Sequence, residues 1–166
     1  MPSFADNGDA FLDALLNSPL IDLYTTDKNG NRISVLSWVW QRSDRLVTLV
    51  KKILERTPSF GLEDPVVTDA VLSDASDEVI RTLIAKGANV NLAVTKAQSN
   101  EIDGSGAKTR RYTRYTKTAL YAAVENKRPN LVRMLLAHGA DAEWRAPGGK
   151  SIRELDTTPR IKALLK

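Results

Sequence analysis

The chain has 166 residues, of which 42% are hydrophobic and 27% are charged, and it carries a formal net charge of +4. It contains no cysteine, which excludes disulfides, thiol catalysis and cysteine-ligated metal sites. No stretch approaches the roughly 18 apolar residues that a membrane-spanning helix needs, and the N-terminal segment has acidic residues where a secretory signal would have basic ones. We therefore expect a cytoplasmic protein that does not enter a membrane.

Short helices are predicted along most of the chain. Hydrophobic spacing and capping residues place them at residues 9–17, 33–41, 44–56, 65–72, 77–86, 118–126 and 130–138. Asp64 and Asp77 are the predicted N-caps of the fourth and fifth helices, and Asn130 caps the last one after Pro129. Gly139 is expected to end the last helix in a left-handed conformation. The last two helices are too short to be stable in water without packing partners.

A pattern of two apolar pairs separated by two residues recurs in the chain. It occurs at residues 11–16, 49–54, 79–84 and 131–136. Two copies are followed by Gly-Ala and an amide or acidic residue, at residues 87–89 and 139–141. Such periodicity predicts an array of units, each of which buries its apolar face against its neighbours.

The residues at 118–124, Thr-Ala-Leu-Tyr-Ala-Ala-Val, are similar to the T-P-L-H-x-A-A helix of the ankyrin-repeat family, with Ala for Pro and Tyr for His. Ser151 lies 33 residues after Thr118, which is one family period. The chain resembles that family over most of residues 10–166. The resemblance implies an all-α fold, an ankyrin-repeat solenoid of helix–turn–helix units with β-turn fingers.

On this interpretation residues 1–166 form a single ankyrin-repeat domain. The resemblance divides it into a cap helix at about 9–17, repeats at about 27–57, 64–91 and 118–141, and a truncated C-terminal repeat at about 151–166.

A long finger is predicted at residues 92–117, between two of the repeats. Val79 and Leu131 stand 52 residues apart, about nineteen more than one family period of 33. Strand-like flanks at 91–96 and 110–116 enclose a turn-like middle, so we predict an extended β-hairpin. The segment holds six basic and two acidic residues, which accounts for the whole net charge of +4.

No residues show the spacing of a catalytic centre, a phosphate loop or a metal site, so we predict a non-enzymatic protein without cofactor or metal. His138, the only histidine, is expected to contact carbonyl groups at a helix end. Trp38 and Trp40 cannot face the same side of one helix, and at least one is expected in the core.

Ankyrin stacks use the fingers and first helices of a concave face to bind other macromolecules, and the resemblance implies contact positions here. They are Lys28, Asn29 and Asn31 in the first loop; Ser73, Asp74, Tyr121, Glu125 and Asn126 on the first helices; Arg111, Tyr112, Arg114, Tyr115 and Lys117 in the long finger; and Trp144, Arg145 and Lys150 in the last finger. Alternation along the strand places Arg111 and Tyr115 on one face, with Tyr112 and Arg114 on the other. Trp144 is expected either to contact a partner or to pack on the neighbouring finger.

These features favour a protein-binding module that sequesters or inhibits a partner with an acidic patch and is a monomer when free. A microbial inhibitor or a toxin-neutralising immunity protein is a narrower form of this hypothesis, and it rests on fold analogy. Two alternatives remain open. One is nucleic-acid binding through the basic finger, although the finger is short and rich in Thr, and the other is a structural or assembly role.

Overall fold

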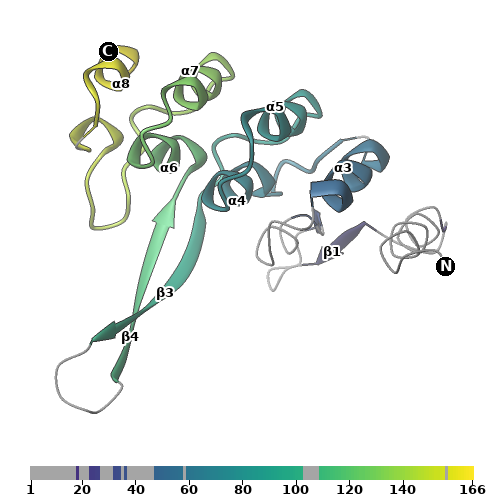
Figure 1. The fold of residues 1–166 in the computed structure, drawn as a ribbon, viewed down its shortest axis with the longest axis horizontal. Coiled ribbons are helices and arrows are strands. Elements are labelled where there is room, and N and C mark those ends of the chain that lie inside the picture. The colour runs from purple at the N-terminus through teal and green to yellow at the C-terminus, as the bar shows by residue number, and fades with distance from the viewer. Residues whose placement is uncertain are drawn as a thin grey trace, which may run out of the picture. The chain divides into compact units, whose positions relative to one another are not determined.

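The computed structural model describes residues 18, 23–26, 32–34, 36, 47–57, 59–102, 109–155 and 157–166. The chain divides into two compact units, Met1–Asn89 and Val90–Lys166, which are called unit 1 and unit 2 below (Figure 1). The predicted cap helix at 9–17 lies outside the described residues, as do Trp38, Trp40 and the predicted contacts Lys28, Asn29 and Asn31.

Unit 1 is built from three described helices and a small antiparallel strand pair. Its elements are β1 (Tyr24–Thr26), β2 (Arg32–Ser34), α3 (Val47–Arg56), α4 (Val66–Leu72) and α5 (Asp77–Ala85). α4 packs against α5, and α3 also contacts α5. The core consists of aliphatic side chains from these helices: Val50, Ile53, Leu54, Val66, Val67, Ala70, Val71, Ile80 and Leu83.

The connection after α3 is held by polar contacts from both sides. The Lys86 ammonium donates to the Thr57 carbonyl at 2.7 Å. Thr57 directly follows α3, and a positive charge there is also favourable for the C-terminal end of the helix dipole. The Tyr24 hydroxyl donates to the Ser59 carbonyl at 2.6 Å. These contacts fix the short path from α3 to α4.

The helix predicted at residues 33–41 is wrong at its beginning. Ile33 and Ser34 belong to β2 and pair with Thr25 and Tyr24, while Leu36 is helical and the rest of the predicted helix lies outside the described residues. Ile33 is β-branched and suits a strand. The strand partner stands several residues earlier in the chain, so helical spacing within 33–41 could not reveal it.

The two predicted N-caps in unit 1 are each displaced by one residue. The N-cap of α4 is Pro65 rather than Asp64, which is buried just before it. The N-cap of α5 is Ser76, whose hydroxyl accepts the Val79 N–H at 3.4 Å, and Asp77 lies in the first turn. Ser and Asp are almost equally good caps, so composition alone does not choose between neighbours.

Unit 2 contains a hairpin followed by a stack of short helices. Its elements are β3 (Val94–Ile102), β4 (Thr109–Lys117), α6 (Ala119–Glu125), α7 (Pro129–Ala137), the 3-10 helix η2 (Ile152–Glu154) and α8 (Pro159–Leu164). α6 packs against α7 and η2, and α7 packs against α8. Buried aliphatic side chains fill the space between them: Leu120, Val124, Leu131, Val132, Leu135, Ile152, Ile161 and Leu165.

Both helices of the predicted repeat at 118–141 are present. Thr118 is the N-cap of α6, and its hydroxyl accepts the Tyr121 N–H at 3.3 Å. α7 begins at Pro129 with Arg128 as its N-cap, so the prediction that Asn130 caps this helix is wrong. Proline lacks the N–H that would be unpaired at a first helical position, which explains why the helix starts there.

The helix pairs α4–α5 and α6–α7 end in the same way. Each first helix is followed by a non-glycine residue with φ of +55°, Asp74 in one unit and Lys127 in the other. Each second helix is followed by a left-handed glycine, Gly87 at +83° and Gly139 at +81°, as predicted for Gly139. The described part of each unit therefore contains a copy of the same helix–turn–helix–turn motif.

The predicted long hairpin is present in unit 2. β3 and β4 pair antiparallel without interruption from Val94 opposite Lys117 to Ile102 opposite Thr109. Near the helices the hydroxyls of Thr95 and Thr116 lie 2.8 Å apart on one face. The hairpin begins three residues later than predicted on its first strand and runs away from the helices of its own unit (Figure 1).

Asn91 fastens the start of the hairpin segment to the loop after α7. Its side-chain Nδ2 donates to the Gly139 carbonyl at 2.9 Å, and its Oδ1 accepts the Asp141 N–H at 2.8 Å. One amide thus satisfies two backbone groups from a loop that lies about fifty residues further along the chain.

We predict that Asn91→Ala lowers the free energy of unfolding by about 1–2 kcal/mol, because two hydrogen bonds of about 1 kcal/mol each are lost. Urea denaturation followed by circular dichroism measures the change. Asn130→Ala is the matched control, since Asn130 is exposed and caps no helix. A loss at Asn130 as large as the loss at Asn91 would contradict the assigned roles.

We also predict opposite effects at the two left-handed turns of unit 2. Gly139→Ala should destabilise by about 1–2 kcal/mol, because the backbone is left-handed there, and no clash contributes since no atom lies within 4 Å of the added Cβ. Lys127→Gly should stabilise by up to about 1 kcal/mol as the same strain is relieved. Denaturant unfolding compares both variants, and changes of the same sign would count against this explanation.

Candidate functional site

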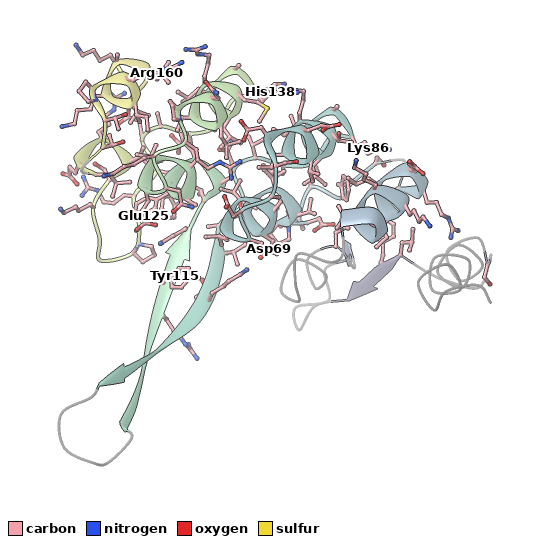
Figure 2. All side chains as sticks on the ribbon, in the orientation of Figure 1. Asp69, Lys86, Tyr115, Glu125, His138 and Arg160 are labelled. Carbon is pink, nitrogen blue, oxygen red and sulfur yellow. The ribbon has the colours of Figure 1, made fainter. Side chains whose placement is uncertain are left out.

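Five of the predicted contact residues meet at the base of the hairpin. They are Tyr115 and Lys117 from β4, Tyr121 and Glu125 from α6, and Trp144 from the loop after α7, and they are called the hairpin-base cluster below. Thr118 alone separates β4 from α6, so the strand leads directly into the helix. Figure 2 labels Tyr115 on the strand and Glu125 on the helix.

Polar contacts of Lys117 within the cluster hold β4 against α6. The Lys117 ammonium forms an ion pair with the Glu125 carboxylate. The same ammonium lies 4.8 Å from the centre of the Tyr115 ring, which is a cation–π contact between residues on one face of β4. The Lys117 side chain is only 21% exposed, so solvent weakens this pair less than it weakens a fully exposed pair.

The aromatic half joins α6 to the last finger. The rings of Tyr121 and Trp144 meet edge to face, with centroids 5.4 Å apart and planes at 80°. Tyr121 is buried while Trp144 is half-buried. Trp144 therefore packs on the first helix of its repeat, an arrangement that neither sequence-based alternative included.

Tyr121 links the two halves electrostatically. Burial raises the pKa of the Tyr121 hydroxyl, the Glu125 carboxylate raises it further, and the Lys117 ammonium opposes them. The side chain is thus neutral at ordinary pH and senses the charges of both partners in the ion pair.

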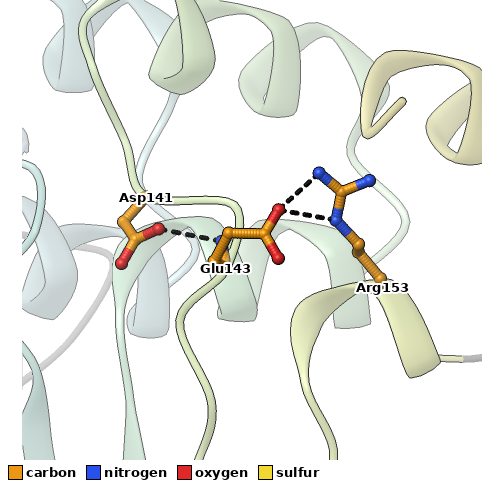
Figure 3. A network of polar contacts seen from close by, with 3 residues as sticks. All are labelled: Asp141, Glu143 and Arg153. Atoms are coloured by element: carbon orange, nitrogen blue, oxygen red, sulfur yellow. Dashed lines mark hydrogen bonds and ion pairs between the residues drawn. The ribbon is translucent and has the colours of Figure 1, made fainter.

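The last finger, residues 140–150, is braced by acidic side chains. The Asp141 carboxylate accepts the Glu143 N–H at 2.8 Å, and the Glu143 carboxylate binds the Arg153 guanidinium, with Nε at 2.8 Å (Figure 3). Arg153 belongs to η2, so these contacts tie the start of the finger to the C-terminal part of the unit. Sequence reasoning missed them because spacing alone does not bring 143 and 153 together.

The other side of this finger is held through Glu154. Its carboxylate accepts the Ser151 N–H at 2.7 Å and also contacts the Arg145 guanidinium at 3.1 Å. These contacts lower the pKa of Glu154, the Ser151 backbone most of all. The predicted contact Arg145 is therefore positioned by η2, although its side chain remains 60% exposed.

The remaining predicted contacts have varied positions. Arg114 and Lys150 are exposed, and Asn126 is an exposed C-cap of α6. Arg111 and Tyr112 lie in β4, paired with Asn100 and Ser99. Ser73 and Asp74 occupy the turn after α4 in unit 1, so they are not part of the cluster that unit 2 forms by itself.

His138 has the structural position that the sequence predicts. Its Nδ1 lies 2.8 Å from the Met134 carbonyl at the end of α7, where Figure 2 labels it. In the described ranges, no group of three or more histidine, aspartate and glutamate residues could hold a metal ion. Those ranges also contain no helix of sufficient length and apolar character to cross a membrane.

Comparison with known families identifies the helix pair of unit 2. Residues 116–146 match the family model for the ankyrin repeat. These residues therefore form an ankyrin repeat. Ankyrin repeats are protein-interaction modules and are generally non-catalytic. The matched segment includes Lys117, Tyr121, Glu125 and Trp144, so most of the hairpin-base cluster belongs to the repeat itself. Neither a curated protein nor a solved structure gives a significant match.

We predict that Glu125→Gln lowers the pKa of Tyr121, because the raising charge is removed while Lys117 continues to lower it. Carbon NMR of labelled tyrosines across a pH series measures the value, and Tyr121→Phe assigns the signal. Glu143→Gln is the control, since Glu143 pairs with Arg153 instead. A Tyr121 pKa that is equal in the wild type and in Glu125→Gln would contradict the assigned coupling.

The same group gives a pH dependence of stability. Because the folded pKa of Tyr121 is raised, its contribution is complete below the ordinary tyrosine value of about 10 and is lost as pH rises through the folded value. Tyr121→Phe should therefore lose less stability above that pH than the wild type does.

Proposed function

We propose that this protein binds a protein partner with an acidic patch and thereby sequesters or inhibits it. The proposed contact surface comprises the hairpin, the first helix α6 and the last finger. The observation that carries the proposal is the hairpin-base cluster, in which β4, α6 and the last finger bring together five predicted contact residues. A microbial inhibitor or a toxin-neutralising protein is one such role, and it rests on fold analogy.

The chemistry of the cluster suits protein recognition. Tyr115 and Trp144 are half-buried aromatic side chains that already contact neighbours, so binding them costs less rotamer entropy than binding freely rotating side chains. Aromatic residues are also the commonest anchors of protein interfaces. Arg114, Arg145 and Lys150 are exposed, and cations at the rim of an interface accelerate encounter with an acidic partner.

We further propose that the predicted repeats at 27–57, 64–91 and 118–141 and the truncated repeat at 151–166 form one solenoid domain. The sequence period and the matching turns after α4–α5 and α6–α7 support this proposal. The free protein is proposed to be a monomer that acts in the cytoplasm, and the absence of cysteine fits a reducing compartment.

The test compares two variants that each remove two exposed positive charges. Arg114→Ser with Lys150→Ser alters the proposed surface, whereas Arg133→Ser with Lys162→Ser alters α7 and α8. Each protein is immobilised and incubated with lysate of the source organism, and mass spectrometry quantifies what is retained. We expect the surface variant to retain a specific partner about tenfold less than wild type, and the control variant to retain it normally.

Equal retention by both variants would contradict the proposed surface. Nuclease treatment of the lysate separates the nucleic-acid alternative, because loss of all capture after digestion, with a steep salt dependence, would favour that function instead. A dimeric mass of the free protein in light scattering would favour the assembly alternative.

A further inference from the structure

The hairpin of unit 2 is a sheet of two strands with two outer edges. β3 and β4 pair only with each other, and no other described strand joins them. In an antiparallel pair, alternate residues of each strand direct their backbone N–H and C=O groups away from the partner. Alternate residues of the nine in β4 therefore offer a row of backbone groups that a further strand could pair with.

Two features that often protect an edge strand, proline and a β-bulge, are missing from β3 and β4, so charge is the protection that β4 has. Neither strand contains proline or glycine, and the nine pairs run without a bulge. A hairpin of two strands is only marginally stable in water, and a third strand adds to its stability. Addition of a strand is thus favourable for the hairpin as well as for the incoming segment.

Charge distinguishes the two edges. β4 carries Arg110, Arg111, Arg114 and Lys117 and no acidic residue, whereas Lys96 and Glu101 balance each other on β3. Basic residues on an edge repel another basic strand, including β4 of a second copy. They attract a strand whose facing positions are Glu or Asp, since directly opposed side chains lie about 5 Å apart.

The base of β4 is already held in place. Lys117 is engaged by Glu125, so the strand is fixed to α6 at one end. The hairpin runs away from α6, α7 and α8 of its own unit, which leaves its outer part away from those helices (Figure 1).

We propose that the outer edge of β4 binds an extended acidic segment of the partner protein as a third strand. This inference rests on the proposed function and specifies the partner: a segment of alternating acidic and β-favouring residues rather than a folded acidic surface. Backbone pairing supplies affinity, and the arginines of β4 select the acidic side chains.

The experiment measures amide hydrogen exchange of the full-length protein with synthetic peptides. The probe alternates Glu and Val over nine residues, the length of β4. One control peptide has Lys in place of Glu. A second keeps every Glu but has Pro in place of Val, which preserves charge while removing alternate backbone donors. We expect only the Glu-Val peptide, at up to about 1 mM, to slow exchange at alternate residues of β4 by about tenfold.

A protein variant tests the role of charge at the same edge. Arg111→Thr with Arg114→Thr retains strand propensity because threonine favours strands. It should bind the Glu-Val peptide about tenfold more weakly than the matched variant Arg133→Thr with Lys162→Thr. Exchange in the absence of peptide shows whether the hairpin persists in each variant, and if it does not, Arg114→Thr alone replaces the double variant.

Several results would overturn the inference. Equal binding of the Glu-Val and Glu-Pro peptides without protection of β4 would show a charged patch only, and protection of β3 would show the wrong edge. Protection of β4 that grows with protein concentration in the absence of peptide would make a second copy the occupant. If these results occurred while the variant Arg114→Ser with Lys150→Ser still lost its partner, the proposed function would stand and strand addition alone would fail.

Discussion

Burial of the aliphatic stripes of α6 and α7 is the interaction on which the site depends. Each helix has fewer than ten residues and could not persist alone in water. Leu120 on α6 and Leu131 and Leu135 on α7 are almost fully buried, and Ile152 and Ile161 from the C-terminal segments complete the core. The same helix α6 that supplies this core also presents Tyr121 and Glu125 to the hairpin base, so packing positions the recognition chemistry.

The long hairpin interrupts the repeat pattern, and both of its ends are attached to the helical part of unit 2. Asn91 joins the segment before β3 to the loop after α7 through two hydrogen bonds. Lys117 joins the end of β4 to α6 through Glu125. Lengthening a loop whose ends stay in place costs little additional entropy, which explains how the finger between two repeats can be extended.

The last finger shows a different way to order a loop. Trp144 is its one large apolar side chain, and ion pairs from Glu143 to Arg153 and from Arg145 to Glu154 additionally brace the finger against η2. Exposed ion pairs contribute little stability individually. Their effect here is geometric, since they limit the orientations of the loop that carries Trp144.

The sequence by itself determined the elements with strong local signals. Apolar spacing located α4 to α7, Gly139 marked a left-handed helix end, and the strand-like segment around Tyr112 and Tyr115 predicted the hairpin. The sequence wrongly predicted Ile33 as helical, because its strand partner lies outside the residues that helical spacing compares. It also placed the N-caps of α5 and α7 on the wrong residue, because neighbouring residues can fill that role equally well and the caps are Ser76 and Arg128. Tertiary structure alone decided which predicted contacts meet. The ring contact of Tyr121 with Trp144 and the ion pair of Lys117 with Glu125 form where a strand, a helix and a loop come together. The spacing of residues along the sequence does not show which segments meet there.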